Sequence, residues 1–517
     1  MVFPNSGQSR CRSLAAAALI LGICSHPGVH GQLDMLKRFE VEARENARGF
    51  EWLTWSSAHI GHRLTGSPQG VRAEEVADSL LRLCGTPRLS YHPFAATAWS
   101  RGSVMLRLSD GEGTEHLAAV ALAQTPDSAA VEGELLDLGN GLAEQFTRLQ
   151  ERVAGRVVLM NIGLVDAPEG TGNLHRSEKA ALAIRHGAIG IVFVNNVEGG
   201  VLLTGTASID GAPIPVPAAC IASEDGLRIR ERLRSGAPLR MALRMTNRTG
   251  SVQARNVVAE VPGTDLAHEM VLVGGHLDSW DLATGATDNG LGAFSIVDMA
   301  RAVVASGHRP RRTLRFVLFM GEEQGLLGSE AMVSDLRSTG ELARVRCMIN
   351  LDMTGDPFGF GVVGPAGWAT TVDSMMRPIQ AVDTAFRGTL REGAWLHSDH
   401  QPFLLAGVPV INPLCDLGGH VYGCYHSSCD DVHLVDPMDM VNNVRFVGML
   451  LLQLADAPTL PRAFTEQELG ARLRREGLEE KLRMAGLWRG PGPPSPPGRG
   501  RRGKVRPCRC RSGSACR

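Results

Sequence analysis

Short apolar runs alternate with helix-like segments over the later part of the chain, from about residue 269 to residue 455. The runs that we expect to form strands are 270–273, 314–320, 345–351 and 408–411. The segments that we expect to form helices are 292–305, 326–336, 399–406 and 438–454. Short apolar strands separated by helices predict an α/β fold, with a mainly parallel sheet covered by helices on both faces.

A second, smaller α/β unit is expected within residues 125–249. Its predicted strands are 157–161, 189–195 and 239–245, and its predicted helices are 177–187 and 224–235. The chain has 517 residues, which is too long for one ordinary core. We therefore expect a small domain inserted into a larger one of residues 35–124 and 250–460, whose first helices would span 35–57 and 71–84.

The first residues have the layout of a secretory signal peptide. Arg10 and Arg12 precede an apolar stretch at 14–23, and small residues follow it. The stretch is too short to span a bilayer comfortably, and a buried N-terminal helix is the alternative. We therefore expect residues 1–24 to be a signal peptide, and the protein to be secreted or otherwise exported, with no membrane span.

Charge is distributed unevenly along the chain, because the carboxyl-terminal segment is basic. Residues 489–517 contain nine basic residues and no acidic one among many glycines and prolines, so residues 488–517 are predicted to be a disordered basic tail. The whole chain has a formal net charge of -1, which leaves the remainder mildly acidic. This balance argues against nucleic acid as the main partner.

Polar side chains follow the predicted strands of the larger domain or lie in nearby loops. In chain order they are His276, Asp278, Asp288, Glu322, Glu323, Asp352 and His426. In an open α/β sheet the carboxyl ends of the strands meet at one edge, so these residues can converge. Imidazoles and carboxylates are ligands suited to zinc, and one carboxylate can bridge two ions. The alternative is that each residue caps a helix or makes an ordinary hydrogen bond.

Two motifs resemble the two-zinc exopeptidases of the aminopeptidase family. They are Gly275-His276-Leu277-Asp278-Ser279-Trp280-Asp281, followed by Asp288, and Glu322-Glu323-Gln324-Gly325. The resemblance covers about residues 35–454 and implies a zinc-exopeptidase fold with an inserted protease-associated-type domain. It implies hydrolysis of a peptide bond next to a free terminus in dipeptides or short peptides, and it leaves a homodimer open. An aminopeptidase on longer peptides, a one-zinc glutaminyl-cyclase-like enzyme and a non-catalytic receptor-like ectodomain remain alternatives.

The resemblance also implies how two Zn²⁺ ions per chain would be held. His276 and Asp352 would bind one ion, Glu323 and His426 would bind the other, and Asp288 would bridge the pair. Two such ions can share and acidify a water molecule and hold the carbonyl that the water attacks.

The remaining implied roles concern proton transfer and orientation. Glu322 would be the general base, and Asp278 would orient His276 from behind. A cis peptide bond between Asp288 and Asn289 is also implied. Two cysteines that are not part of the recognised pattern, Cys424 and Cys429, flank the last ligand, and both a disulfide and two unpaired thiols are open.

Overall fold

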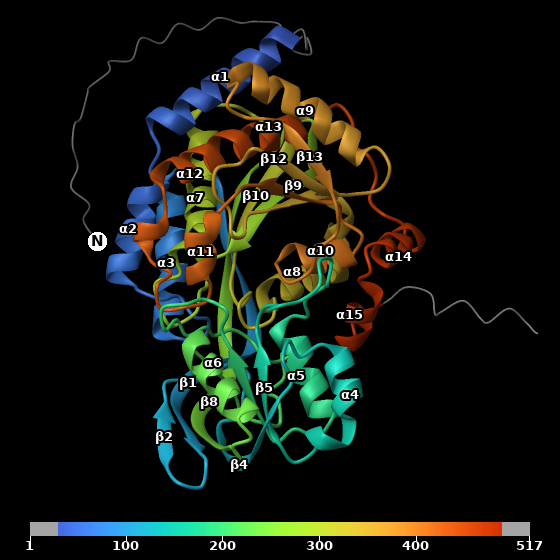
Figure 1. The fold of residues 1–517 in the computed structure, drawn as a ribbon. Coiled ribbons are helices and arrows are strands. Elements are labelled where there is room, and N and C mark those ends of the chain that lie inside the picture. Colours follow the sequence, from blue (N-terminus) through green and yellow to red (C-terminus); the bar gives the residue numbers. More distant parts are fainter. Residues whose placement is uncertain (1–28, 489–517) are drawn as a thin grey trace, which may run out of the picture.

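The computed structural model describes residues 29–488, and within them 14 strands join in one sheet (Figure 1). The centre of the larger domain consists of β9 (Leu266–His276), β10 (Arg312–Phe319), β11 (Val345–Asn350) and β14 (Val410–Leu414). These strands pair in parallel, β10 with β9, β9 with β11, and β11 with β14. The predicted α/β fold with a mainly parallel sheet is confirmed.

The two faces of this sheet carry separate apolar cores. Along β9, Val271 and Val273 belong to one core, while Met270 and Leu272 belong to the other. This division follows because successive side chains of a strand point to opposite faces. The first core includes α1 (Val29–Glu45), α3 (Pro68–Leu83), α7 (Leu291–Ala305), α9 (Trp368–Val382) and α13 (Gly448–Asp456). The second includes α8 (Leu327–Ser338) and α10 (His400–Leu405).

The single helix expected at 35–57 is wrong, because two helices occupy this segment. α1 ends at Glu45, and α2 (Gly49–His59) begins after a short break. A carboxylate oxygen of Asp298 on α7 accepts hydrogen bonds from the backbone amides of Arg48 and Gly49, at 2.9 and 3.1 Å. A contact with a distant helix therefore fixes where the second helix starts. The expected helix at 438–454 is present as one uninterrupted helical run, α12 (Pro437–Asn442), a π-helical turn at Asn443–Val447 and α13.

The inserted unit lies below the larger domain in Figure 1. It contains β4 (Ser128–Asp137), β5 (Val157–Asn161), β6 (Gly190–Val194) and β7 (Ala218–Ile221), with α4 (Ala143–Val153), α5 (Arg176–Arg185) and α6 (Ser223–Arg234). The two units share a long antiparallel ladder of β1 (Arg88–Ser109) and β8 (Arg240–Val261). β8 is continuous across residues 249 and 250, so the segment predicted as the strand 239–245 extends into the larger domain.

After residue 460 the chain forms two more helices, α14 (Glu466–Arg475) and α15 (Glu479–Met484). Their residues Leu469, Leu473 and Leu482 are buried in the core beside α8 and α10. The predicted signal peptide at 1–24 lies outside the described residues, as does the predicted tail apart from Trp488. Among the described helices, none combines the length and the apolar character required to cross a bilayer.

Candidate metal centre

The strand register brings the predicted polar residues together. His276 is the last residue of β9 and pairs with Phe319 at the end of β10, while Asn350 of β11 pairs with Gly274. Glu322, Glu323 and Asp352 follow these strand ends directly. The carboxyl ends of three adjacent parallel strands therefore deliver imidazole and carboxylate groups to one edge of the sheet.

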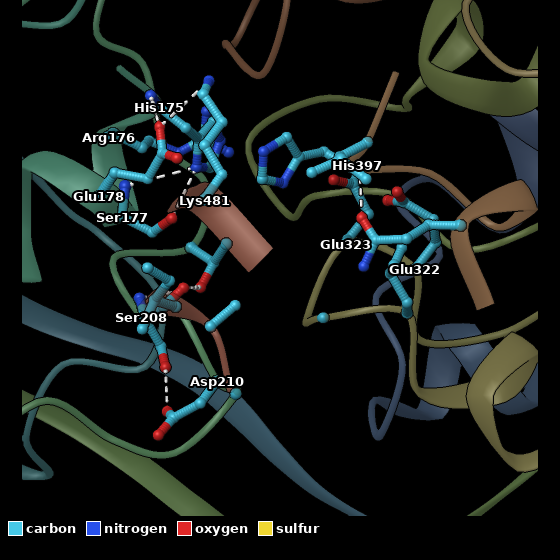
Figure 2. A pocket seen from close by; sticks show the side chains of 18 of the residues that line it. His175, Arg176, Ser177, Glu178, Ser208, Asp210, Glu322, Glu323, His397 and Lys481 are labelled. Carbon is cyan, nitrogen blue, oxygen red and sulfur yellow. Dashed lines mark hydrogen bonds and ion pairs between the residues drawn. The ribbon is translucent and has the colours of Figure 1, made fainter. Parts of the chain in front are cut away.

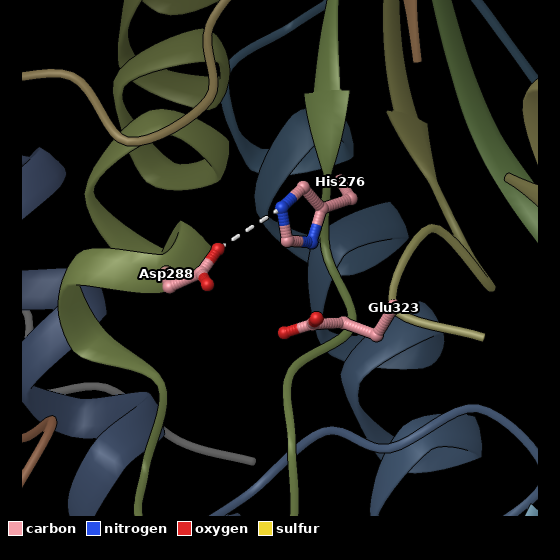
Figure 3. A group of neighbouring side chains, drawn as sticks. All are labelled: His276, Asp288 and Glu323. Carbon is pink, nitrogen blue, oxygen red and sulfur yellow. Dashed lines mark ion pairs between the residues drawn. The ribbon is translucent and has the colours of Figure 1, made fainter. Parts of the chain in front are cut away.

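Asp288 occupies the centre of the cluster. One of its oxygens lies 3.3 Å from Nε2 of His276, and the other lies 3.0 Å from Nε2 of His426. Asp352 Oδ1 is 3.3 Å from the same nitrogen of His276, and Glu323 Oε2 is 3.1 Å from that of His426. Figure 3 shows Asp288 and Glu323 facing the imidazole of His276. The five side chains thus form two groups that share Asp288.

The chemistry of this set fits a divalent cation. Donor atoms of His276, Asp288 and Glu323 all lie within 4.8 Å of one another, and all three residues are buried. Oε1 of Glu323 is buried without a hydrogen-bond partner. Burial opposes protonation of His276, yet the nearby carboxylates of Glu322 and Asp352 raise its pKa well above the usual value. The raised pKa of His276 reflects an excess of negative charge around it. A bound cation would balance this charge.

The hydrogen bond behind His276 sets which ring nitrogen faces the cluster. Nδ1 of His276 lies 3.0 Å from the backbone carbonyl of Asp278. Because a carbonyl only accepts, Nδ1 carries a hydrogen, and Nε2 is the nitrogen left to bind a cation in the cluster. The carboxylate of Asp278 is 3.9 Å from Nδ1, and it accepts hydrogen bonds from the amide of Glu322 at 3.2 Å and the hydroxyl of Thr65 at 3.1 Å. Asp278 therefore touches His276 through its backbone and holds Glu322 through its side chain.

The adjacent glutamates differ in their contacts. Glu323 reaches His426, whereas the nearest imidazole nitrogen to Glu322 is Nε2 of His276, at 3.9 Å. Burial raises the pKa of Glu322 well above its usual range; His276 opposes this shift, and Asp352 with Glu323 reinforces it. A buried carboxyl with a raised pKa beside such a cluster is suited to accept and return a proton.

Two loop-fixing residues were missed by the sequence analysis. Arg63 is fully buried and donates hydrogen bonds to the carbonyls of Leu277, Thr284 and Gly285, at 2.5, 2.6 and 2.8 Å. It holds the loop between His276 and Asp288 from a position more than 200 residues earlier, and no local pattern marks it.

Asp430 is the second residue that was missed. Its Oδ1 accepts from the amide and hydroxyl of Thr287 at 2.8 and 2.7 Å, and its Oδ2 accepts from the amide of Asp288 at 3.1 Å. The sign in the sequence that could have identified Asp430 is its position four residues after His426. The peptide bond between Asp288 and Asn289 is cis, as the resemblance implied, and Cys424 and Cys429 form a disulfide.

A cavity of about 390 Å³ opens in front of the cluster. Glu322 and Glu323 lie on one side of it, and residues of the inserted domain with Lys481 of α15 lie on the other (Figure 2). Arg176, at the start of α5, is buried, and its guanidinium is 3.1 Å from Nδ1 of His426. No ion pair among the described residues includes Arg176, and its Nε has no hydrogen-bond partner. Sequence analysis missed this residue too, since only the packing of the two domains brings it to the cluster.

Comparison with known proteins defines the class. Residues 256–450 match peptidase family M28, and residues 119–229 match the PA domain. The fold, the cluster and these matches define a metallo-exopeptidase with an inserted PA domain. Residues 256–450 thus carry a peptidase family M28 domain, which confirms the resemblance found in the sequence.

Individual relatives agree with this assignment. Human carboxypeptidase Q is 27% identical over 417 residues, covering 77% of this chain and 84% of the relative. A probable leucine aminopeptidase 2 of Aspergillus fumigatus is 32% identical over 254 residues, covering 45% of this chain and 47% of the relative. The crystal structure of a peptidase M28 precursor from Shewanella amazonensis has the same fold, with a TM-score of 0.74 and 22% identity over 84% of this chain and 99% of that one.

Proposed function

We propose that this protein is a zinc-dependent exopeptidase that hydrolyses dipeptides or short peptides next to a free terminus. The observation that carries the proposal is the sharing of Asp288 between two histidines. His276 and Asp352 would hold one zinc ion, Glu323 and His426 would hold a second, and Asp288 would bridge them. When bound, the zinc ions would supply Lewis-acid stabilisation of the carbonyl oxygen and lower the pKa of water.

Glu322 is the proposed general base. Its carboxylate accepts a proton from the attacking water and returns it to the amine of the departing residue. The hydrogen bond from the backbone amide of Glu322 to the carboxylate of Asp278 supports this role, because it fixes the position of the Glu322 backbone. Thr65 in turn holds Asp278 from outside the loop. General-base catalysis of this kind contributes typically about 10²–10⁴-fold to the rate.

Arg176 is the proposed contact for the free terminus. Its hydrogen bond to Nδ1 of His426 requires that nitrogen to accept, because a guanidinium only donates. A cation held by Nε2 of His426 places the imidazole hydrogen on Nδ1, which removes this acceptor. The guanidinium is then left facing the cavity, where the α-carboxylate of a peptide is its natural bidentate partner. This favours cleavage next to a free carboxyl terminus.

An exported location is part of the proposal. The disulfide between Cys424 and Cys429 supports it, because disulfides persist mainly in oxidising compartments. The signal-like pattern at residues 1–24 is the second support.

The test combines metal content with a substrate panel. Elemental analysis of the purified full chain should give two zinc ions per chain, and a chelator should abolish hydrolysis until zinc is restored. A dipeptide should be cleaved faster than the same dipeptide amidated at its carboxyl end. One zinc per chain with cyclisation of amino-terminal glutamine would favour the glutaminyl-cyclase-like alternative, and preference for the amidated substrate would favour an aminopeptidase. Zinc binding without hydrolysis would overturn the enzyme proposal.

A further inference from the structure

The loop that carries His426 is closed into a small ring by the disulfide between Cys424 and Cys429, five positions apart. Cys424 ends α11 (Gly418–Cys424), and His426 has a φ of 54°. A left-handed conformation is uncommon for a residue other than glycine and persists where the surroundings enforce it. The ring around His426 is one such constraint on the direction of its imidazole.

Hydrogen bonds reinforce the ring from inside and outside. The hydroxyl of Ser427 donates to the carbonyl of Cys424 at 2.8 Å and lies 3.2 Å from Sγ of Cys429. The amide of Thr204, in the inserted domain, donates to the carbonyl of His426 at 2.9 Å. The two contacts of the Ser427 hydroxyl depend on the two cysteines staying close, since Ser427 touches both.

The ring is also connected, through Asp430, to a second proposed ligand, Asp288. Asp430 is the next residue after Cys429, and its carboxylate holds the backbone amides of Thr287 and Asp288. Movement of the Cys429 end of the ring would therefore displace Asp430 and release Asp288. The disulfide thus adjoins both His426 and Asp430, the residue that holds Asp288, so it is linked to two of the five proposed ligands.

The ring is too short to serve mainly as a stabiliser of the whole fold. Cross-links that close long loops restrict the unfolded chain most, and this one spans five positions. Both cysteines are half-buried, so neither belongs to the closed interior of the domain. The other cysteines of the described chain, Cys84, Cys220, Cys347 and Cys415, are unpaired.

We propose that the Cys424–Cys429 disulfide positions His426 and Asp288, so that its reduction lowers the affinity of the site for zinc. The inference rests on the proposed zinc-dependent function. In the reaction with a trialkylphosphine and water, the sulfur–sulfur bond breaks, both sulfurs become thiols, and the phosphine is oxidised to its oxide. The protein is thereby made sensitive to reducing conditions at its metal site.

The experiment measures zinc affinity of the folded full chain by competition with a coloured chelator, before and after phosphine treatment. Reduction should lower the affinity about 10–100-fold, the usual effect of losing a contact behind a metal ligand. Reoxidation should restore it. Dipeptide hydrolysis at limiting zinc should fall in parallel and recover when zinc is added in excess.

Two variants complete the design. The double variant C424S/C429S should have the low affinity of the reduced protein and show no further change with phosphine, which controls for any direct effect of the reductant on zinc. C415S, which removes a half-buried unpaired thiol, should respond to phosphine as the unmodified protein does. If reduction changes affinity less than twofold while the oxidised protein binds zinc and cleaves dipeptides, the positioning role is overturned and the proposed function stands. If the oxidised protein binds no zinc, both are overturned.

Discussion

The carboxylate of Asp430 accepts a hydrogen bond from the backbone amide of Asp288 at 3.1 Å. Through this contact the segment after His426 fixes the loop that carries the shared carboxylate of the cluster. Asp430→Asn replaces one accepting oxygen by a donating amide, so one backbone amide loses its partner. We expect zinc affinity about 10–100-fold lower, with little change in the melting temperature.

Chelator competition on the Asp430→Asn variant checks this expectation. Asp416→Asn, an exposed change on the same stretch of chain, is the matched control and should leave affinity unchanged. Unaltered zinc affinity in Asp430→Asn would show that Asp288 needs no support from this side chain.

Substitutions of the adjacent residues Glu322 and Glu323 should have different effects on zinc content and activity. Glu323→Gln removes a charged oxygen that faces His426, so we expect loss of both zinc and activity. Glu322→Gln keeps the shape but removes the proposed base, so zinc should stay while kcat on a dipeptide falls about 10²–10⁴-fold. Elemental analysis and steady-state kinetics on the two variants provide the measurement. Equal zinc loss in both, or an active Glu322→Gln enzyme, would contradict these roles.

Arg176→Met should weaken the preference for a free carboxylate. A hydrogen bond to a charged group contributes about 1.5–3 kcal/mol, so kcat/KM for the free dipeptide should fall roughly 10–100-fold. The amidated dipeptide should change much less. Arg148→Met, an exposed change on α4 of the same domain, serves as the control. An equal loss on both substrates would mean that Arg176 supports the site and does not bind the terminus.

The pH profile should reflect the buried position of Glu322. The base acts in its ionised form, and burial raises its pKa. Activity should therefore be lost, as pH falls, at a higher pH than the value of about 4.3 that is typical of an exposed glutamate. The acidic limb of kcat/KM at saturating zinc gives the measurement, with zinc content checked at each pH. A limb at or below the ordinary value would argue against Glu322 as the base.

Truncation should show that residues 489–517 and the preceding helix α15 contribute differently to stability. Removing residues 489–517, whose composition cannot support a core, should leave the melting temperature and dipeptide hydrolysis nearly unchanged. Truncation after Gly477 also removes α15 and the buried Leu482, and should destabilise the protein by about 2–5 kcal/mol. Thermal unfolding and a dipeptide assay on both proteins check the contrast. Loss of stability on removal of residues 489–517 alone would show that this tail packs against the folded domain.

Much of the fold was predictable because its signals are local. Apolar runs mark the strands of a sheet buried on both faces, and in a parallel sheet the residues after such strands must gather at one edge. This reasoning predicts that His276, Glu323 and Asp352 lie near one another. The resemblance added roles to these residues, and the cis bond after Asp288 agrees with it.

The remaining features depend on contacts between distant segments. The break between α1 and α2 is determined by Asp298, which lies about 250 residues further along. Arg63 and Arg176 reach the cluster only because helices and an inserted domain pack against the strand ends. Neither residue belongs to a periodic pattern or a motif, so the sequence carried no sign of its partner. Local periodicity thus determined which elements form and where their polar ends lie, whereas tertiary packing decided which side chains complete and hold the site.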